Sequence, residues 1–226
     1  MSTDLLQQTA PEPGSTRLVA SLAIAGFLSG LIIIGIYVAT LPTITENKAR
    51  ELREAVFKVL PGVTRMQKLQ FDGEQVGIKH EGKDDENTLY AGYDAKHRFV
   101  GYAIASEGPG FQDTIRLLYG YQPAERKVVG MEILESRETP GLGDKIYKDA
   151  AFVANFDELA VDPQIVAVKK GTKSEPNEID AITGATISSK AVVRIINEGN
   201  QRWLPRLPLP GNEPAMQNNI AKQEVQ

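Results

Sequence analysis

Asp180-Ala181-Ile182-Thr183-Gly184-Ala185-Thr186 predicts a turn that leads directly into a helix. It ends a polar loop at residues 169–180 and opens an apolar stretch with helical spacing, residues 191–196. The start of a helix offers unpaired N–H groups and the positive end of the helix dipole, which suit an anionic phosphate. Thr186 places a hydroxyl there that can be esterified. The same seven residues also fit an ordinary capped helix with a Gly-Ala turn.

A second motif, Glu138-Thr139-Pro140-Gly141-Leu142-Gly143-Asp144-Lys145-Ile146, follows a strand-like segment at residues 128–134. The Pro-Gly pair at its centre favours a turn in which Pro fixes the first central residue and Gly takes the positive φ of the second. A plain turn without a functional role is the alternative interpretation of this motif taken alone.

Behind one apolar span, the two motifs together resemble the RnfG family, the FMN-carrying G subunits of the Rnf electron transport complex. They also resemble the related C subunit of the sodium-pumping NADH:quinone oxidoreductase. In this family the first motif is the flavinylation pattern Asp-x-x-(Ser/Thr)-Gly-Ala-Thr, and the second is the Glu-Thr-Pro-Gly-Leu-Gly signature. Both are intact here, and the resemblance extends from the span to about Trp203. The uninterrupted second motif and the short layout of span plus domain are closer to the Rnf protein.

The resemblance implies that FMN is joined through its phosphate to Thr186, with Thr183, Gly184 and Ala185 beside it. It also implies that a separate flavin transferase makes this bond and reads Asp180 together with the Gly184-Ala185-Thr186 core. A simple turn or cap carboxylate is the alternative role of Asp180.

The second motif is implied to pack against the flavin, with Thr139 and Leu142 nearest the ring. Gly141 and Gly143 are expected to permit close approach. Glu138 is expected either at the flavin or as an acceptor that stabilises the loop through backbone N–H bonds, and the sequence does not separate these roles.

Two neighbouring features are left with two interpretations each. Lys145 is expected to pair either with the phosphate or with Asp144. The Gly108-Pro109-Gly110-Phe111 segment is expected to form a hairpin loop, and the alternative is that it lines the same site.

By resemblance, the protein is a membrane-anchored electron carrier in a complex that couples electron transfer between ferredoxin and NAD to ion translocation. The chain has no expected catalytic residues and no activity of its own. Its expected partners are the other membrane proteins of the Rnf-type complex, the flavin transferase and membrane lipid, and not nucleic acid. The alternatives are a flavoprotein like the C subunit of the sodium-pumping enzyme and a flavin-free, membrane-anchored assembly module. An intact Thr186 argues against the flavin-free module.

The composition supports an organic cofactor as the electron carrier. The 226 residues fit one domain plus an anchor, and a net charge of −4 gives no basic patch for nucleic acid. Because the chain has no cysteine, thiol redox chemistry and thiolate-bound iron–sulfur clusters are excluded. His80 and His97 lack ligand-like spacing, so no metal site is expected.

A membrane segment is predicted at residues 18–41, because no charged residue stands between Arg17 and Glu46. About 22 residues rising 1.5 Å each span roughly 33 Å, enough for the hydrocarbon core and too long for a signal peptide. Basic residues after the span would place the large domain in the cytoplasm by the positive-inside rule. Long domains translocate largely regardless of charge, and the resembling family has this domain outside. We therefore expect residues 1–17 as a cytoplasmic tail and residues 42–226 on the periplasmic side of a bacterial inner membrane.

The remainder predicts an α+β fold, in which one transmembrane helix precedes a mostly antiparallel-sheet, FMN-binding domain with flanking helices. The domain is placed at residues 61–203, after a connecting helix at 42–60 that starts with a capping box at Thr43-Ile44-Thr45-Glu46. Residues 144–156 are expected to be helical in parts, and 204–226 are expected to be a flexible or loosely packed tail. The predicted strands are 88–93, 98–105, 114–121 and 127–134.

Overall fold

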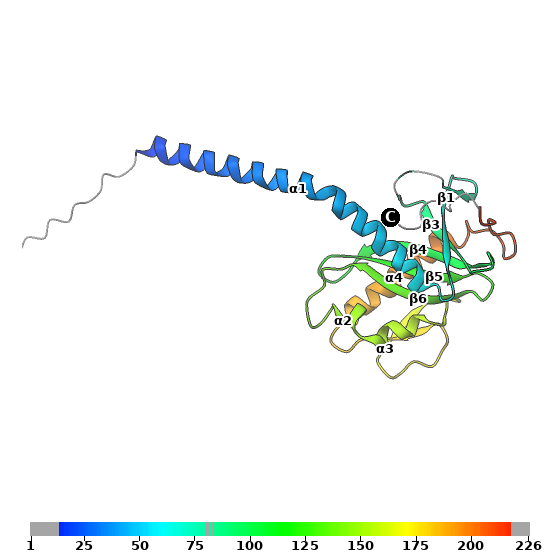
Figure 1. The fold of residues 1–226 in the computed structure, drawn as a ribbon. Coiled ribbons are helices and arrows are strands. Elements are labelled where there is room, and N and C mark those ends of the chain that lie inside the picture. The colour runs from blue at the N-terminus through cyan, green and yellow to red at the C-terminus, as the bar shows by residue number, and fades with distance from the viewer. Residues whose placement is uncertain (1–13, 80–81, 83, 218–226) are drawn as a thin grey trace, which may run out of the picture. The chain divides into compact units, whose positions relative to one another are not determined.

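The computed structural model describes residues 14–79, 82 and 84–217, shown as a ribbon in Figure 1. The chain forms two compact units, Met1–Ala49 and Arg50–Gln226. Most of the expected cytoplasmic tail, His80 and the last nine residues of the expected C-terminal tail, 218–226, lie outside the described residues.

Helix α1, Ser15–Val59, is 45 residues long and contains an exposed window with a mean hydropathy of 2.4. Among the described helices, α1 is the one that is long and apolar enough to cross a membrane. The predicted capping box at Thr43 is wrong, because the helix continues through this segment and through Pro42. Thr45 Oγ1 donates to the carbonyl of Leu41 at 2.9 Å, so this hydroxyl bonds back along the helix.

Most of the domain is one sheet in the order β2-β1-β3-β4-β5-β6-β7, with every pair antiparallel. Strands β8 and β9 form a separate parallel pair. The strands are β1 (Arg65–Phe71), β2 (Val76–Ile78), β3 (Thr88–Tyr93), β4 (Phe99–Pro109), β5 (Thr114–Gln122), β6 (Lys127–Glu135), β7 (Leu159–Ala160), β8 (Val166–Val168) and β9 (Glu178–Asp180). The remaining helices are α2 (Lys145–Lys148), α3 (Ala150–Val153), the 3-10 helix η1 (Ala154–Phe156) and α4 (Thr186–Trp203). The predicted α+β class and its mostly antiparallel sheet are confirmed.

Successive strand residues point to opposite sides of the sheet, so both faces carry apolar side chains. Each face is covered by one helix. On one face, α4 covers a core that includes Tyr102, Ile104 and Tyr119. On the other face, the last turns of α1 pack in one cluster with Ala103 and Leu118. Figure 1 shows the end of α1 lying across the strands of the sheet. This second helix lies directly on the strands, since a Cβ built at Gly120 would come 1.9 Å from the Val59 carbonyl oxygen.

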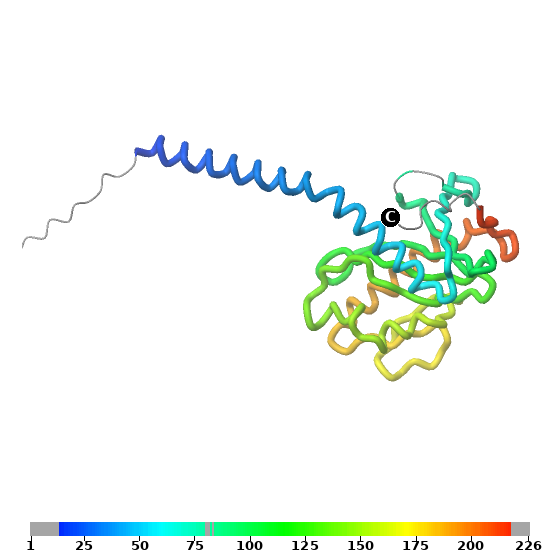
Figure 2. The backbone as a smooth tube through the Cα atoms, in the orientation of Figure 1, coloured from blue at the N-terminus to red at the C-terminus, as the bar shows by residue number. Residues whose placement is uncertain are grey.

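The segment after α4, which was expected to be flexible or loosely packed, contacts the domain. Leu204, Leu207 and Met216 pack against the main core. The backbone of the segment is also bound to the sheet, because Tyr93 Oη donates to the Pro214 carbonyl at 2.6 Å and the Gln217 N–H donates to Gln67 at 2.9 Å. Figure 2 shows the segment, in orange to red, running beside β1 and β3. Scattered apolar residues therefore hold residues 204–217 against the domain, although every residue of this segment is exposed or half-buried.

Candidate functional site

A tight turn precedes α4 and is built by the first motif. The N–H of Ala185 donates to the carbonyl of Ile182 at 3.0 Å, and Gly184 takes the positive φ of +85° that this turn needs. The buried Ser189 braces the turn from within the helix. Its hydroxyl accepts from the N–H of Ile182 at 3.0 Å and donates to the carbonyl of Ala185 at 2.9 Å. Gly184 and Ser189 therefore fix the path of the backbone.

Helix α4 begins with unsatisfied backbone donors. Its first helical hydrogen bond runs from the N–H of Ser189 to the carbonyl of Ala185, and Ala185 gives no side-chain cap. Among the described residues, the N–H groups of Thr186, Ile187 and Ser188 have no hydrogen-bond partner. Thr186 is exposed, and its Oγ1 lies 3.4 Å from the carbonyl oxygen of Ile182, a weak contact. The site combines an exposed threonine, whose hydroxyl makes only this weak contact, with the positive end of a long helix.

Glu138 joins the two motifs. One oxygen of its carboxylate accepts from the N–H groups of Phe111 and Gln112 at 2.9 and 3.0 Å, and the other accepts from the hydroxyl of Ser188. Its side chain is buried with only 5% exposed. Of its two expected roles, this geometry matches the loop-stabilising acceptor. It also brings the tip of the β4–β5 hairpin, which contains Gly108-Pro109-Gly110-Phe111, to the start of α4.

The electrostatics of Glu138 agree with this role. Burial opposes its charge, but hydrogen bonds from Ser188 and from the N–H groups of Gln112 and Phe111 outweigh burial and lower the pKa of the carboxyl below its usual value. Gly143 leaves the space that Glu138 occupies, because a Cβ at that position would lie 2.7 Å from the Glu138 Cβ. Gly143 was predicted to permit a close approach, and in the structure the group that approaches it closely is the Glu138 side chain.

The predicted Pro-Gly turn is confirmed in the second motif. The N–H of Leu142 donates to the carbonyl of Thr139 at 3.2 Å, and Gly141 has a φ of +78°. A Cβ at Gly141 would meet open space. Glycine is therefore favoured here by the positive φ of the turn and not by a lack of room for a side chain. Thr139 Oγ1 donates to the side chain of Gln112 at 3.0 Å. Leu142 is half exposed and reaches the first motif, since a Cβ at Gly184 would lie 3.7 Å from its Cδ2.

Asp180 ends β9 and holds the neighbouring loop. Its Oδ1 accepts from the N–H of Gly171 at 2.8 Å, and its own N–H donates to Asn155 at 3.2 Å. The turn-carboxylate role left open for Asp180 is therefore present in the structure.

A surface pocket of about 470 Å³ lies beside the first motif, lined by Lys145, Lys148, Asp149, Lys170, Ile182 and Thr183. Asp144 forms its ion pair with Lys148 at 2.7 Å and not with Lys145. Sequence reasoning missed Lys148 and Lys170 because they belong to no motif and are distant in the chain. The lysine-rich loop at residues 169–173 is the signal that could have found Lys170.

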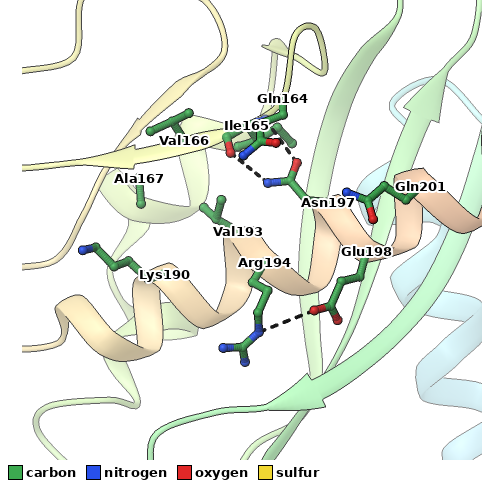
Figure 3. A pocket seen from close by; sticks show the side chains of 10 residues that line it. All are labelled: Gln164, Ile165, Val166, Ala167, Lys190, Val193, Arg194, Asn197, Glu198 and Gln201. Atoms are coloured by element: carbon green, nitrogen blue, oxygen red, sulfur yellow. Dashed lines mark hydrogen bonds and ion pairs between the residues drawn. The ribbon is translucent and has the colours of Figure 1, made fainter.

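A second pocket, of about 520 Å³, lies between α4 and β8 (Figure 3). Asn197 spans one wall, accepting from the N–H of Ile165 at 3.1 Å and donating to its carbonyl at 2.8 Å. None of the predicted site residues lines this pocket. In the part of the chain that the structure describes, no group of three or more His, Cys, Asp or Glu side chains is placed to hold a metal ion.

The fold and the paired motifs define a flavin-binding class of domain. Residues 110–201 match the family described as FMN-binding domain. Two solved structures have the same fold. Shewanella oneidensis NqrC gives a TM-score of 0.54 at 18% identity, covering 69% of this chain and 95% of that one. The C subunit of the Na(+)-translocating NADH-quinone reductase from Parabacteroides distasonis gives 0.57 at 16% identity, covering 74% and 94%.

Curated relatives identify the family within this class. The chain is 31% identical over 181 residues to the G subunit of the proton-translocating ferredoxin:NAD(+) oxidoreductase complex of Clostridium ljungdahlii, covering 80% of this chain and 87% of that protein. It is 29% identical to the G subunit of the ion-translocating oxidoreductase complex of Methanosarcina acetivorans, covering 79% and 88%. The chain belongs to the RnfG family, the G subunits of ion-translocating oxidoreductase complexes, as its motifs predicted.

Proposed function

We propose that this protein is a membrane-anchored electron carrier that holds FMN covalently through Thr186. It acts as one subunit of a complex that couples electron transfer between ferredoxin and NAD to ion translocation. The observation that carries the proposal is the exposed hydroxyl of Thr186 beside three unpartnered N–H groups at the start of α4. The FMN-binding family match and the names of the curated relatives support it.

FMN supplies one- and two-electron chemistry when bound, and the chain supplies attachment, orientation and electrostatics. An ester bond to Thr186 Oγ1 leaves one negative charge on the phosphate. The N–H groups and dipole at the start of α4 stabilise that charge. Ser189 holds the turn that aims this end of the helix, and Glu138 holds the second motif beside it. Thr139 and Leu142 border the flavin ring in this proposal, together with Thr183, Gly184, Ala185 and Gly141.

Attachment requires a separate flavin transferase, which recognises Asp180, Gly184, Ala185 and Thr186. Asp180 has a structural contact of its own to Gly171, so its substitution tests recognition only if the fold is measured alongside. The other partners are the remaining membrane proteins of the complex and the lipid around α1.

The protein is anchored by α1 with its N-terminus in the cytoplasm and residues 42–226 on the periplasmic side of the inner membrane. A reporter belongs after Gln226, because residues 204–217 pack on the domain. A phosphatase that folds only outside the cytoplasm should be active there. An inactive phosphatase together with a bright cytoplasmic fluorescent protein at the same position would contradict this orientation.

Covalent flavin separates the proposal from a flavin-free assembly module. The full chain, co-expressed with a flavin transferase, is denatured and examined for ultraviolet fluorescence on a gel, because only covalent flavin survives denaturation. A fluorescent band that is lost in Thr186→Val supports the carrier. A dark parent band supports the module.

A further inference from the structure

The pocket beside Thr183 is built from three separate segments. Lys145 and Lys148 come from α2, Lys170 comes from the loop at residues 169–172, and Ile182 and Thr183 come from the turn before α4. Three lysines and Thr183 therefore line one hollow.

The positive charge of this pocket is only partly neutralised. Lys148 is bound to Asp144 at 2.7 Å. Asp149, the one acidic residue in the lining, caps α3 by accepting from the N–H groups of Ala151 and Phe152. Among the described residues, Lys145 and Lys170 have no carboxylate within 4.0 Å. The pocket thus offers two unpaired cations to an anionic ligand.

The loop that carries Lys170 is held in place. Thr172 binds the carbonyl of Lys169 through its N–H at 3.0 Å and through its hydroxyl at 2.7 Å, and Gly171 takes a φ of +80°. Asp180 fixes the loop from the outside by accepting from the N–H of Gly171 at 2.8 Å. The acidic residue of the first motif therefore positions a lysine of the pocket.

Thr186 follows closely on the two residues of the first motif that line the pocket. Thr186 Oγ1 lies 3.4 Å from the carbonyl oxygen of Ile182, and Ile182 lines the pocket with its neighbour Thr183. A phosphate bonded to Thr186 Oγ1 would therefore lie next to a pocket whose Lys145 and Lys170 have no carboxylate partner among the described residues.

We propose that this pocket is a phosphate-binding subsite that holds the phosphate end of FMN, with Lys145 and Lys170 as its specificity-determining residues. The proposal rests on the function proposed above and adds to it a recognition site that works without the covalent bond. Asp180 acts in it as a positioning residue, through Gly171 and the loop of Lys170.

The test uses full-length Thr186→Val protein in detergent, so that no ester forms. FMN and riboflavin, which differ by the phosphate alone, are titrated against it by fluorescence. FMN should bind about tenfold more tightly than riboflavin, because two charge-assisted contacts form only with the phosphate. Inorganic phosphate should compete with FMN and leave riboflavin binding unchanged.

Three single variants, one of them a control, test which lysines are responsible. Lys170→Gln should reduce the preference for FMN over riboflavin roughly threefold, as should Lys145→Gln. Lys169→Gln removes the same charge one residue away, outside the pocket lining, and should keep the preference. Equal affinities for the two flavins, no measurable binding of FMN, or equal losses in Lys169→Gln and Lys170→Gln would each overturn the proposal. Failure of covalent loading in the parent chain is a separate result, which overturns the ester to Thr186 and leaves this preference measurable.

Discussion

The carboxylate of Glu138 accepts a hydrogen bond from the hydroxyl of Ser188, 50 residues further along the chain. This bond connects the second motif to the first turn of α4. The same carboxylate holds the β4–β5 hairpin through the N–H groups of Phe111 and Gln112. Glu138 is therefore a structural centre of the candidate site, at which three segments meet.

Removal of this side chain should destabilise the domain. Glu138→Ala leaves the N–H groups of Phe111 and Gln112 and the hydroxyl of Ser188 without their acceptor. We expect the free energy of unfolding to fall by about 2–4 kcal/mol, measured by denaturant titration. Glu158→Ala changes an exposed carboxylate and should stay within about 0.5 kcal/mol of the parent. Equal effects of the two variants would remove Glu138 from this structural role.

Glu138 should also make the free energy of unfolding depend on pH in the acidic range. Because the pKa of Glu138 is lower in the folded protein than its usual 4.5, its contribution is present above pH 4.5 and is lost as pH falls through the folded pKa. The free energy of unfolding of the parent should therefore decrease more steeply below pH 4.5 than that of Glu138→Gln. Parallel curves for the two proteins would contradict the lowered pKa.

Gly143 tests the packing around Glu138. Gly143→Ala adds a methyl group that would lie 2.7 Å from the Cβ of Glu138, and we expect a loss of about 1–3 kcal/mol in thermal or denaturant unfolding. Gly77→Ala is the control, because a Cβ there meets open space. A Gly143→Ala protein as stable as Gly77→Ala would show that the loop relaxes freely.

The sequence predicted those parts of the fold that have a strong local signal. The four strands of the sheet centre and the start of α4 follow from β-branched and aromatic runs and from the small residues before Thr186. Strand β1 was missed because Gln67 and other polar residues interrupt its pattern, although Gln67 is buried in the structure. The prediction of a helix cap at Thr43 was wrong because one helix runs through this residue. No local feature of the sequence distinguishes a true cap from a threonine inside a helix.

The candidate site was predicted only as two motifs, and their connection required the structure. Nothing in the sequence pairs Glu138 with Ser188 or brings Lys170 to Thr183, because both relationships depend on how distant segments fold together. The role of Gly141 in a turn followed from Pro140 beside it. The role of Gly143 could not be predicted from the sequence, because only the folded loop brings the Glu138 side chain against it.

Leu142 tests the proposed contact with the flavin ring. It is half exposed, so Leu142→Ala should leave the fold and the covalent loading intact. Loss of an apolar contact of about 1 kcal/mol that differs between oxidised and reduced flavin shifts a two-electron potential by roughly 20 mV. Redox titration of the loaded protein measures this shift, with the exposed Leu209→Ala as control. Potentials and flavin spectra identical to the parent in Leu142→Ala, and likewise in Thr139→Val, would place this loop away from the ring.

The intact mass of the full chain, measured after co-expression with a flavin transferase, tests covalent attachment without any intermediate assumption. We predict a mass increase of one FMN in the parent, located on the peptide that contains Thr186. We predict no increase in Thr186→Val, while Thr183→Val retains the increase. Covalent FMN on Thr186→Val, or an unmodified parent chain in the presence of an active transferase, would contradict the assignment of Thr186 as the attachment site.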